Sequence, residues 1–241
     1  MRNPAHYLFF SGDIQDRRII LDRSETRHAT AALRLKPGQQ FSATDGNGSI
    51  FQCVFVSMHD ERLTAEITGT ESVSRLKPEI KLAIGLPERD HFEMIVEQAT
   101  ALGITTIAPV VFRFCQKPWW DRNWTKLNDR FARITSTSMK QCRYPYMPEI
   151  RKPREFGEMI SGLTGMIVVA DQDGASPSEV QKRVAGSDTL TVVIGPPGGI
   201  TEVELEQLHG TGALPMRIAR TRLRTELAAV VCCAQIMGWF I

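Results

Sequence analysis

The stretch from residue 189 to residue 231 constrains the fold more than any other part of the chain. Residues 190–194 form a short apolar run rich in β-branched side chains, which is typical of a strand buried on both faces of a parallel sheet. The run ends at the Gly-Pro-Pro-Gly-Gly motif of residues 195–199, where prolines stop the ladder and glycines leave the backbone open to close approach. Thr201 and Glu204 then have the spacing of a capping box at the start of a helix.

The loop after this strand is a predicted ligand site. Open α/β sheets bind ligands beyond the carboxyl ends of their strands, beside the N-termini of helices. A second unusual loop, residues 218–226, is rich in arginine and leads into an apolar helix. The 195–199 motif alone would equally suit a plain turn, so the interpretation depends on the two loops together.

The two loops resemble motifs of a known family. Residues 194–199 resemble "IGPEGG" and residues 223–228 resemble "LRTETA", both found in SPOUT-class methyltransferases of the RsmE type, which methylate N3 of a uridine in 16S ribosomal RNA. The resemblance implies an α/β fold: a SPOUT domain with a parallel sheet and a deep trefoil knot, preceded by a small PUA-like β-barrel. It also implies that S-adenosylmethionine binds at the knot without a metal and leaves as S-adenosylhomocysteine.

The resemblance assigns cofactor binding to residues of these two loops. They are Ile194, Gly195, Pro196, Gly198, Gly199, Ile218, Ala219, Leu223 and Arg224. Methyl transfer depends on holding the nucleophile in line with the methyl group, and uridine N3 becomes nucleophilic only after its proton leaves. The charge then spreads onto the ring carbonyl oxygens, where an arginine can stabilise it, so Arg224 is the first catalytic candidate and Arg222 the second. Glu226 is also explained as a helix-start carboxylate, and no general base stands out.

The first 75 residues have the pattern of a small β-rich unit. Strands are expected at 41–44, 50–56 and 63–68, with a hairpin signal between the first two. Residues 27–38 resemble the "HHxxxVLRxxxGD" stretch of the PUA-like domain, which implies that His28 and Arg34 face RNA. A short helix with solvated basic residues would also fit this segment.

The polar stretch at 72–78 is the expected linker, which gives domains at 1–75 and 76–241. After it, apolar spacing predicts strands at 80–86, 104–111 and 166–170, and helices at 121–142, 154–161 and 177–185. A further helix is expected to begin at Asp90, with Glu93 completing a capping box. The first strand–helix–strand unit predicts parallel pairing with a right-handed crossover. Family matches continue at 93–103 and 141–150.

Positive charge concentrates between residues 113 and 154. This segment has eleven Lys or Arg against three acids, a balance of +8, although the whole chain carries only +2. It also contains Trp119, Trp120, Trp124, Tyr144 and Tyr146. Cations provide affinity for phosphates, and exposed aromatics stack on unpaired bases, so RNA contact is predicted here. A solvated helix face with core aromatics would give the same counts. Arg143, and Arg220 in the second loop, join His28 and Arg34 as RNA-binding candidates.

Cysteines and apolar segments limit the cellular setting. The five cysteines are odd in number and form no Cys-x-x-Cys pair, which favours reduced thiols in a cytoplasmic protein. The start resembles no signal peptide, and residues 227–241 are shorter than the roughly 20 residues that span a bilayer. This last segment is expected to be buried in a core or subunit interface, and the resemblance implies a homodimer. No Gly-x-Gly-x-x-Gly follows a strand, which disfavours a dehydrogenase.

The chain departs from the family pattern at several positions. Pro197 replaces Glu, Ala219 replaces Gly, Leu227 replaces Thr, and Tyr144 replaces Arg. The resemblance as a whole still makes methylation of uridine N3 in the 16S RNA of the small ribosomal subunit the main hypothesis. The alternative is an RNA-binding or ribosome-assembly protein of the same fold with altered or lost activity.

Overall fold

The chain forms two compact units in the computed structural model, which describes residues 7–115, 119–120 and 123–241. The first unit contains residues 1–75 and also residues 136–147. The second contains residues 76–135 and 148–241. No pattern in the sequence indicated that residues 136–147 return to the first unit.

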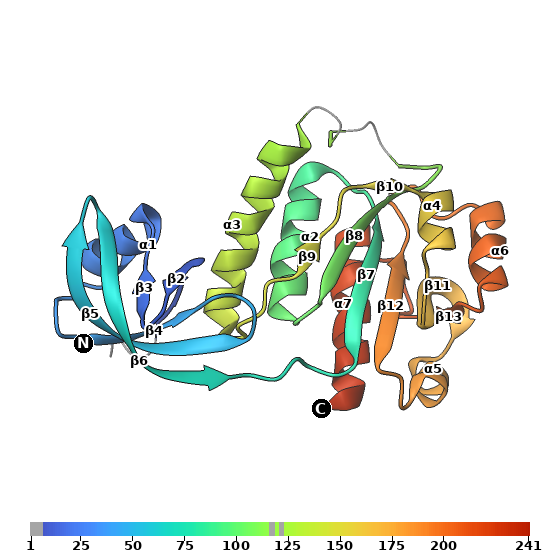
Figure 1. The fold of residues 1–241 in the computed structure, drawn as a ribbon. Coiled ribbons are helices and arrows are strands. Elements are labelled where there is room, and N and C mark those ends of the chain that lie inside the picture. Colours follow the sequence, from blue (N-terminus) through green and yellow to red (C-terminus); the bar gives the residue numbers. More distant parts are fainter. Residues whose placement is uncertain (1–6, 116–118, 121–122) are drawn as a thin grey trace. The chain divides into compact units, whose positions relative to one another are not determined.

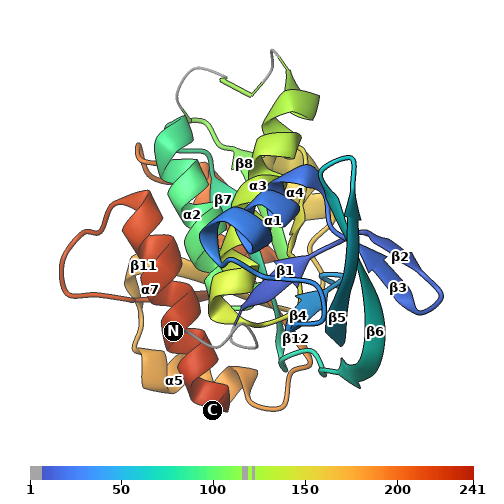
Figure 2. The same cartoon turned by 90° about the vertical axis from the view of Figure 1, so that its left-hand side faces the viewer.

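The first unit is built on a curled six-stranded sheet, a half-barrel with the strand order β1-β4-β5-β6-β3-β2 (Figure 2). All of its neighbouring strands are antiparallel except β1 and β4. The expected hairpin joins β4 to β5. The strands are β1 (Leu8–Phe10), β2 (Asp13–Gln15), β3 (Arg18–Ile20), β4 (Gln40–Thr44), β5 (Ser49–His59) and β6 (Arg62–Ser72). Helix α1 (Arg23–Arg27) continues into a π-helical turn at His28–Ala32.

The second unit has a parallel sheet with the order β10-β8-β7-β12-β11-β13, and β9 also pairs with β8. Its strands are β7 (Glu79–Gly85), β8 (Thr106–Val111), β9 (Glu149–Ile150), β10 (Arg154–Glu155), β11 (Met166–Ala175), β12 (Thr189–Ile194) and β13 (Leu214–Met216). Its helices are α2 (Arg89–Ala101), α3 (Trp124–Cys142, whose last residues belong to the first unit), α4 (Phe156–Ser161), α5 (Pro177–Val184), α6 (Glu202–Gly210) and α7 (Thr225–Met237). A 3₁₀ turn at Gly238–Phe240 follows α7.

Both faces of this sheet are covered by helices. Figure 1 shows α2 and α7 on one side, and α4 and α6 on the other. Alternate residues of β12 therefore enter different cores: Val192 packs with α2 and α7, whereas Val193 packs with α4 and α6. Residues 190–194 are all buried, which confirms the prediction of a strand covered on both faces. Each such apolar side chain contributes about 1.5 to 3 kcal/mol on burial.

The two predicted capping boxes had different outcomes. The one at α6 is confirmed, because Glu204 N–H donates to Thr201 Oγ1 at 3.2 Å and Thr201 N–H donates to Glu204 Oε2 at 2.9 Å. The one at α2 was wrong: Glu88 is the N-cap residue, and Asp90 lies in the first turn. Glu93 is available for other partners, and it binds Arg130.

The tryptophans of the basic segment serve packing. Trp120 is 7% exposed, Trp119 donates its Nε1–H to the carbonyl of Pro87 at 2.9 Å, and Trp124 packs against Phe131. The alternative of core aromatics on a solvated face therefore describes these three side chains. Lys117, Asp121 and Arg122, which also entered the charge count, lie outside the described residues.

Candidate functional site

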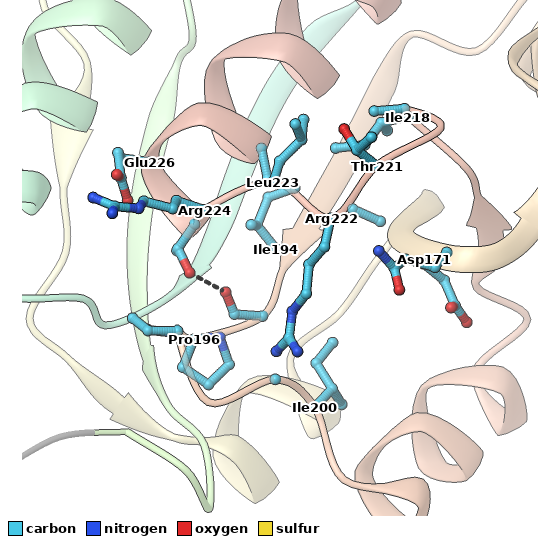
Figure 3. A pocket seen from close by; sticks show the side chains of 18 of the residues that line it. Asp171, Ile194, Pro196, Ile200, Ile218, Thr221, Arg222, Leu223, Arg224 and Glu226 are labelled. Atoms are coloured by element: carbon cyan, nitrogen blue, oxygen red, sulfur yellow. Dashed lines mark hydrogen bonds between the residues drawn. The ribbon is translucent and has the colours of Figure 1, made fainter.

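A cavity of about 810 Å³ lies at the carboxyl ends of β11 and β12, within the second unit (Figure 3). The loop after β12 forms one wall, and the loop before α7 forms another. Of the predicted site residues, Ile194, Gly195, Pro196, Gly199, Ile218, Ala219, Arg222, Leu223 and Arg224 line it, and Gly198 and Arg220 do not. A ligand-sized space at this edge of a parallel sheet is what the strand–loop–helix pattern predicted.

The loop after β12 is a tight turn. Gly199 N–H donates to the carbonyl of Pro196 at 2.8 Å, and Gly199 has a positive φ of 87°. Pro197 thus occupies the second position of a β-turn, where proline fits and its missing N–H is not needed for the turn. The replacement of the family's glutamate by Pro197 is therefore compatible with the loop conformation. A Cβ added to Gly198 would lie 2.6 Å from Phe114 Cβ, so close packing explains this glycine.

Hydrogen bonds join the loop after β12 to the start of α7 and join the second loop to Gln235 on α7. Thr225 Oγ1 donates to the carbonyl of Gly195 at 3.1 Å, drawn as a dashed line in Figure 3. Gln235 on α7 donates its Nε2–H to the carbonyl of Ile218 at 3.0 Å, which fixes the far end of the second loop. The sequence showed Gln235 only as an interruption of an apolar segment.

Charged side chains of both signs surround the cavity. Figure 3 shows Arg222 and Arg224 leaving the second loop in different directions, with Arg222 extending toward the 196–200 turn. Glu226 lies in the first turn of α7, and its Oε1 is 4.0 Å from His91 Nε2 on α2. Thr225 and Glu226 are the first two residues of α7, and both line the cavity. Thr225 holds the 195–199 loop by its hydrogen bond, and Glu226 adds a carboxylate to the cavity wall.

Sequence reasoning missed several polar lining residues. Asp171, Gln172 and Asp173 come from β11, and Glu88 and His91 come from the start of α2. Residues 171–173 directly follow the strand expected at 166–170, whose carboxyl end meets the same sheet edge as that of β12. Their position after this strand was the signal that could have identified them.

The four predicted RNA-binding residues are divided between the two units. His28, Arg34 and Arg143 belong to the first unit, and Arg220 belongs to the second. All four are exposed, and none forms an ion pair recorded within the described part of the chain. His28 follows α1 with its ring edge-on to Phe9, at 6.0 Å between centroids.

The described residues contain no group of three or more His, Cys, Asp or Glu side chains that could hold a metal ion. In the same part of the chain, no helix combines the length and the apolar character that crossing a membrane requires. The five thiols are free, and burial raises the pKa of Cys232 well above its usual range and that of Cys233 to about 12. These two buried thiols are therefore poor nucleophiles.

Comparisons with known proteins cover nearly the whole chain. Residues 74–237 match the model of the RNA methyltransferase domain, and residues 21–68 match that of the RNA methyltransferase PUA domain. The chain is 27% identical over 237 residues to ribosomal RNA small subunit methyltransferase E of Aquifex aeolicus, covering 97% of this chain and 100% of that protein. It is 26% identical over 217 residues to the protein of the same name from Mycobacterium bovis, covering 88% and 83%.

Solved structures show the same fold. The structure of ribosomal RNA small subunit methyltransferase E from Neisseria gonorrhoeae bound to S-adenosyl methionine matches with a TM-score of 0.84 at 20% identity, over 96% of this chain and 97% of that one. The crystal structure of a probable rRNA-methyltransferase from Porphyromonas gingivalis also has a TM-score of 0.84, at 24% identity, over 97% and 98% of the two chains.

Proposed function

The chain belongs to the RNA methyltransferase family, and we propose that it transfers the methyl group of S-adenosylmethionine to N3 of a uridine in 16S ribosomal RNA. The observation that carries the proposal is the cavity bounded by residues 194–200 and 218–226, the two segments that carry the family motifs. The names of the relatives support the ribosomal substrate, and the cofactor bound in the Neisseria gonorrhoeae structure supports the methyl donor.

The residues present fit this cofactor. The cavity volume of about 810 Å³ lies within the range of small-molecule sites, roughly 300 to 1,000 Å³. Carboxylates at Asp171, Asp173 and Glu226 and guanidinium groups at Arg222 and Arg224 suit a ligand that bears a sulfonium, an ammonium and a carboxylate. Three of the five residues in the turn at 195–199 are glycines, so their backbone carries no side chain of its own. When bound, S-adenosylmethionine supplies an electrophilic methyl group.

The arginines of the second loop act on the uridine. Loss of the N3 proton puts negative charge on the ring carbonyl oxygens, and a guanidinium N–H placed there stabilises it. Arg224 is the first candidate because it lines the cavity directly before the start of α7, with Arg222 second. Thr225 and Gln235 act as positioning residues, because their hydrogen bonds hold the backbone on both sides of these arginines.

The proposal extends to RNA binding, assembly and topology. His28, Arg34 and Arg143 of the first unit and Arg220 of the second contact RNA, with residues 1–75 as the PUA-like domain and 76–241 as the methyltransferase domain.

The protein works as a homodimer in the cytoplasm. Two exposed apolar side chains on packed helices, Leu227 on α7 (49% exposed) and Met94 on α2 (46%), support a subunit interface. The hydrogen-bonded contact of the two loops is compatible with the expected trefoil knot.

Nucleoside mass spectrometry of 16S RNA from cells that lack the gene tests the reaction. We expect N3-methyluridine to be lost, and to be restored by the wild-type gene and by Arg217→Ala, an exposed arginine outside the cavity. Arg224→Ala should not restore it, because removing one stabilising donor at the reacting group typically costs on the order of 100-fold in rate. Retention of the modified nucleoside in the deletion strain would overturn the proposal.

The alternative is an RNA-binding or assembly protein without methyl transfer, and Ala219, whose methyl group lines the cavity where the family has glycine, favours it. Calorimetry with S-adenosylmethionine separates the two. Binding that is weakened by Arg222→Ala or Arg224→Ala supports the enzyme, and an absence of binding supports the alternative.

A further inference from the structure

A second, smaller cavity of about 80 Å³ lies in the second unit and shares no lining residue with the first. It sits against β7, β8 and β12 under α4 and the segment 151–154. Ile84 and Ile194 pair at the end of the sheet that faces the large cavity, three residues beyond Lys81 and Thr191. At about 3.3 Å per residue, Lys81 and Thr191 lie roughly 10 Å along the strands from that pair.

The floor of this cavity is a polar row across three strands. Lys81 on β7 pairs in register with Thr106 on β8 and with Thr191 on β12, so the three side chains lie on one face of the sheet. Thr106 and Thr191 are each 6% exposed. Within the described residues, the structure records no hydrogen bond from either hydroxyl. Both residues line the cavity, where a hydroxyl that can donate and accept suits a polar occupant.

Small side chains leave room for that occupant. The next row along the same face is Ala108, Ala83 and Val193, paired in register, and its two alanines line the cavity. Ala83 belongs to an apolar core with Val193 and Met159. Larger side chains in place of the two alanines would extend this core into the cavity. Ala83 and Ala108, which lie next to the Lys81–Thr106–Thr191 row, therefore keep the cavity open.

The lining carries four cations and no acid. They are Lys81, Arg151, Lys152 and Arg154. Arg151 donates two hydrogen bonds to Glu149 Oε2, at 3.1 and 3.0 Å, and is neutralised by it. The other three have no ion pair recorded among the residues that the structure describes. Lys152 and Arg154 are exposed and Lys81 is half-buried, so positive charge extends from the surface to the floor.

We propose that this cavity binds a phosphate group. The Lys81 ammonium and the hydroxyls of Thr106 and Thr191 provide donors at the floor, and the planar fork of Arg154 matches two phosphate oxygens at the mouth. Charge-assisted hydrogen bonds of this kind are about twice as strong as neutral ones. The phosphate belongs either to the backbone of an RNA chain or to a small free phosphate. The site does not depend on methyl transfer.

Titration of the full chain with inorganic phosphate, followed by calorimetry, tests the site. We expect Lys81→Met, which keeps the length of the side chain, to weaken phosphate binding about tenfold or more, since a hydrogen bond to a charged group is lost. Thr191→Val, which keeps the shape of the row, should also weaken it. Arg183→Ala, an exposed cation on α5 outside both cavities, is the matched control and should leave it unchanged.

The outcomes of this titration are distinct. If Lys81→Met binds phosphate as well as the wild type, or if Arg183→Ala weakens binding equally, the proposal is wrong and the cavity holds only water. Circular dichroism melting of Lys81→Met and Thr191→Val excludes loss of fold as the cause. Binding of S-adenosylmethionine should be the same in both variants, so this test and that of the proposed function fail independently.

A second measurement identifies the source of the phosphate. If the group belongs to RNA, Lys81→Met lowers affinity for a 16S RNA fragment and reduces the slope of log affinity against log salt by about 1. If it is a small free phosphate, Lys81→Met loses phosphate binding and keeps the RNA affinity and slope of the wild type. Either result supports a phosphate site, provided that the titration with inorganic phosphate has succeeded.

Discussion

Glu204 ties the turn after β12 to the segment that follows β8. It is 8% exposed; its Oε1 accepts from Arg113 N–H at 2.8 Å, and its Oε2 accepts from Thr201 N–H at 2.9 Å. We expect Glu204→Ala to lower the free energy of unfolding by about 1 to 3 kcal/mol, because buried donors lose their acceptor. Urea denaturation measures this loss, and calorimetry should show weaker binding of S-adenosylmethionine.

Glu204→Gln provides the matched comparison. The amide keeps the shape of the side chain and one acceptor oxygen, so this variant should lie between the wild type and Glu204→Ala in both measurements. Equal stability of the wild type and Glu204→Ala would show that this carboxylate does not hold the turn.

At the residue scale, the sequence was informative where the backbone chemistry is local. Four of the five residues at 195–199, and Arg222 and Arg224 of the second loop, line the cavity, whereas Gly198 and Arg220 do not. Glu88 and His91 were not identified, because they reach the cavity through the packing of α2, and Asp171 was missed although it directly follows a predicted strand. The Lys81–Thr106–Thr191 row was equally hidden, since cross-strand register pairs Lys81 with residues 25 and 110 positions away.

At the scale of elements, α2 and α3 are joined within the second unit by a bidentate ion pair. Arg130 donates from Nε to Glu93 Oε1 at 2.5 Å and from its NH2 nitrogen to Oε2 at 2.6 Å. The hydrogen bond from Arg130 is the main cause that holds the pKa of Glu93 below its ordinary value of 4.5. A lowered folded-state pKa means that the pair stabilises the protein above pH 4.5, and that this contribution is lost as the pH falls through the lowered pKa.

We therefore expect Glu93→Gln to be less stable than the wild type at pH 7, by an amount that shrinks as the pH falls below 4.5. Urea denaturation of both proteins between pH 7 and pH 3 measures the difference. Glu206→Gln, an exposed carboxylate on α6, is the control and should show little difference at any pH. A difference for Glu93→Gln that stays constant with pH would mean that the pair does not link these helices.

Element prediction succeeded or failed for identifiable reasons. The apolar runs of β7, β8 and β12 are long and regular, and their pairing is parallel as expected. The start of α2 was misplaced because Asp90 and Glu93 have the spacing of a capping box, although Asp90 lies inside the first turn and Glu88 is the N-cap residue. Strand β13 was missed because Pro215 interrupts it; it lies at the sheet edge, where proline is tolerated.

At the scale of the whole molecule, the end of α3 and the loop after it belong to the first unit, although the expected boundary between the two domains lies after residue 75. Residues 136–147 belong to the first unit, where Lys140 forms an ion pair with Glu25, and Tyr146 donates its hydroxyl to the carbonyl of Val73 at 2.7 Å. The helical pattern continues unbroken through residue 135, so no local signal marks the change. Only the tertiary contacts of Lys140 and Tyr146 reveal it.

This arrangement predicts that a fragment of residues 76–241 will be less stable than the same residues in the full chain. Met139, which is fully buried, would become exposed, and Lys140 and Tyr146 would lose Glu25 and Val73. We expect a lower melting temperature by circular dichroism and binding of a hydrophobic dye, because exposed apolar surface costs about 25 cal/mol per Å². Met139→Gln and Tyr146→Gln in the fragment should reduce the dye signal, since they replace the exposed apolar groups. A fragment that melts with the full chain and binds no dye would show that residues 136–147 do not depend on the first unit to remain ordered.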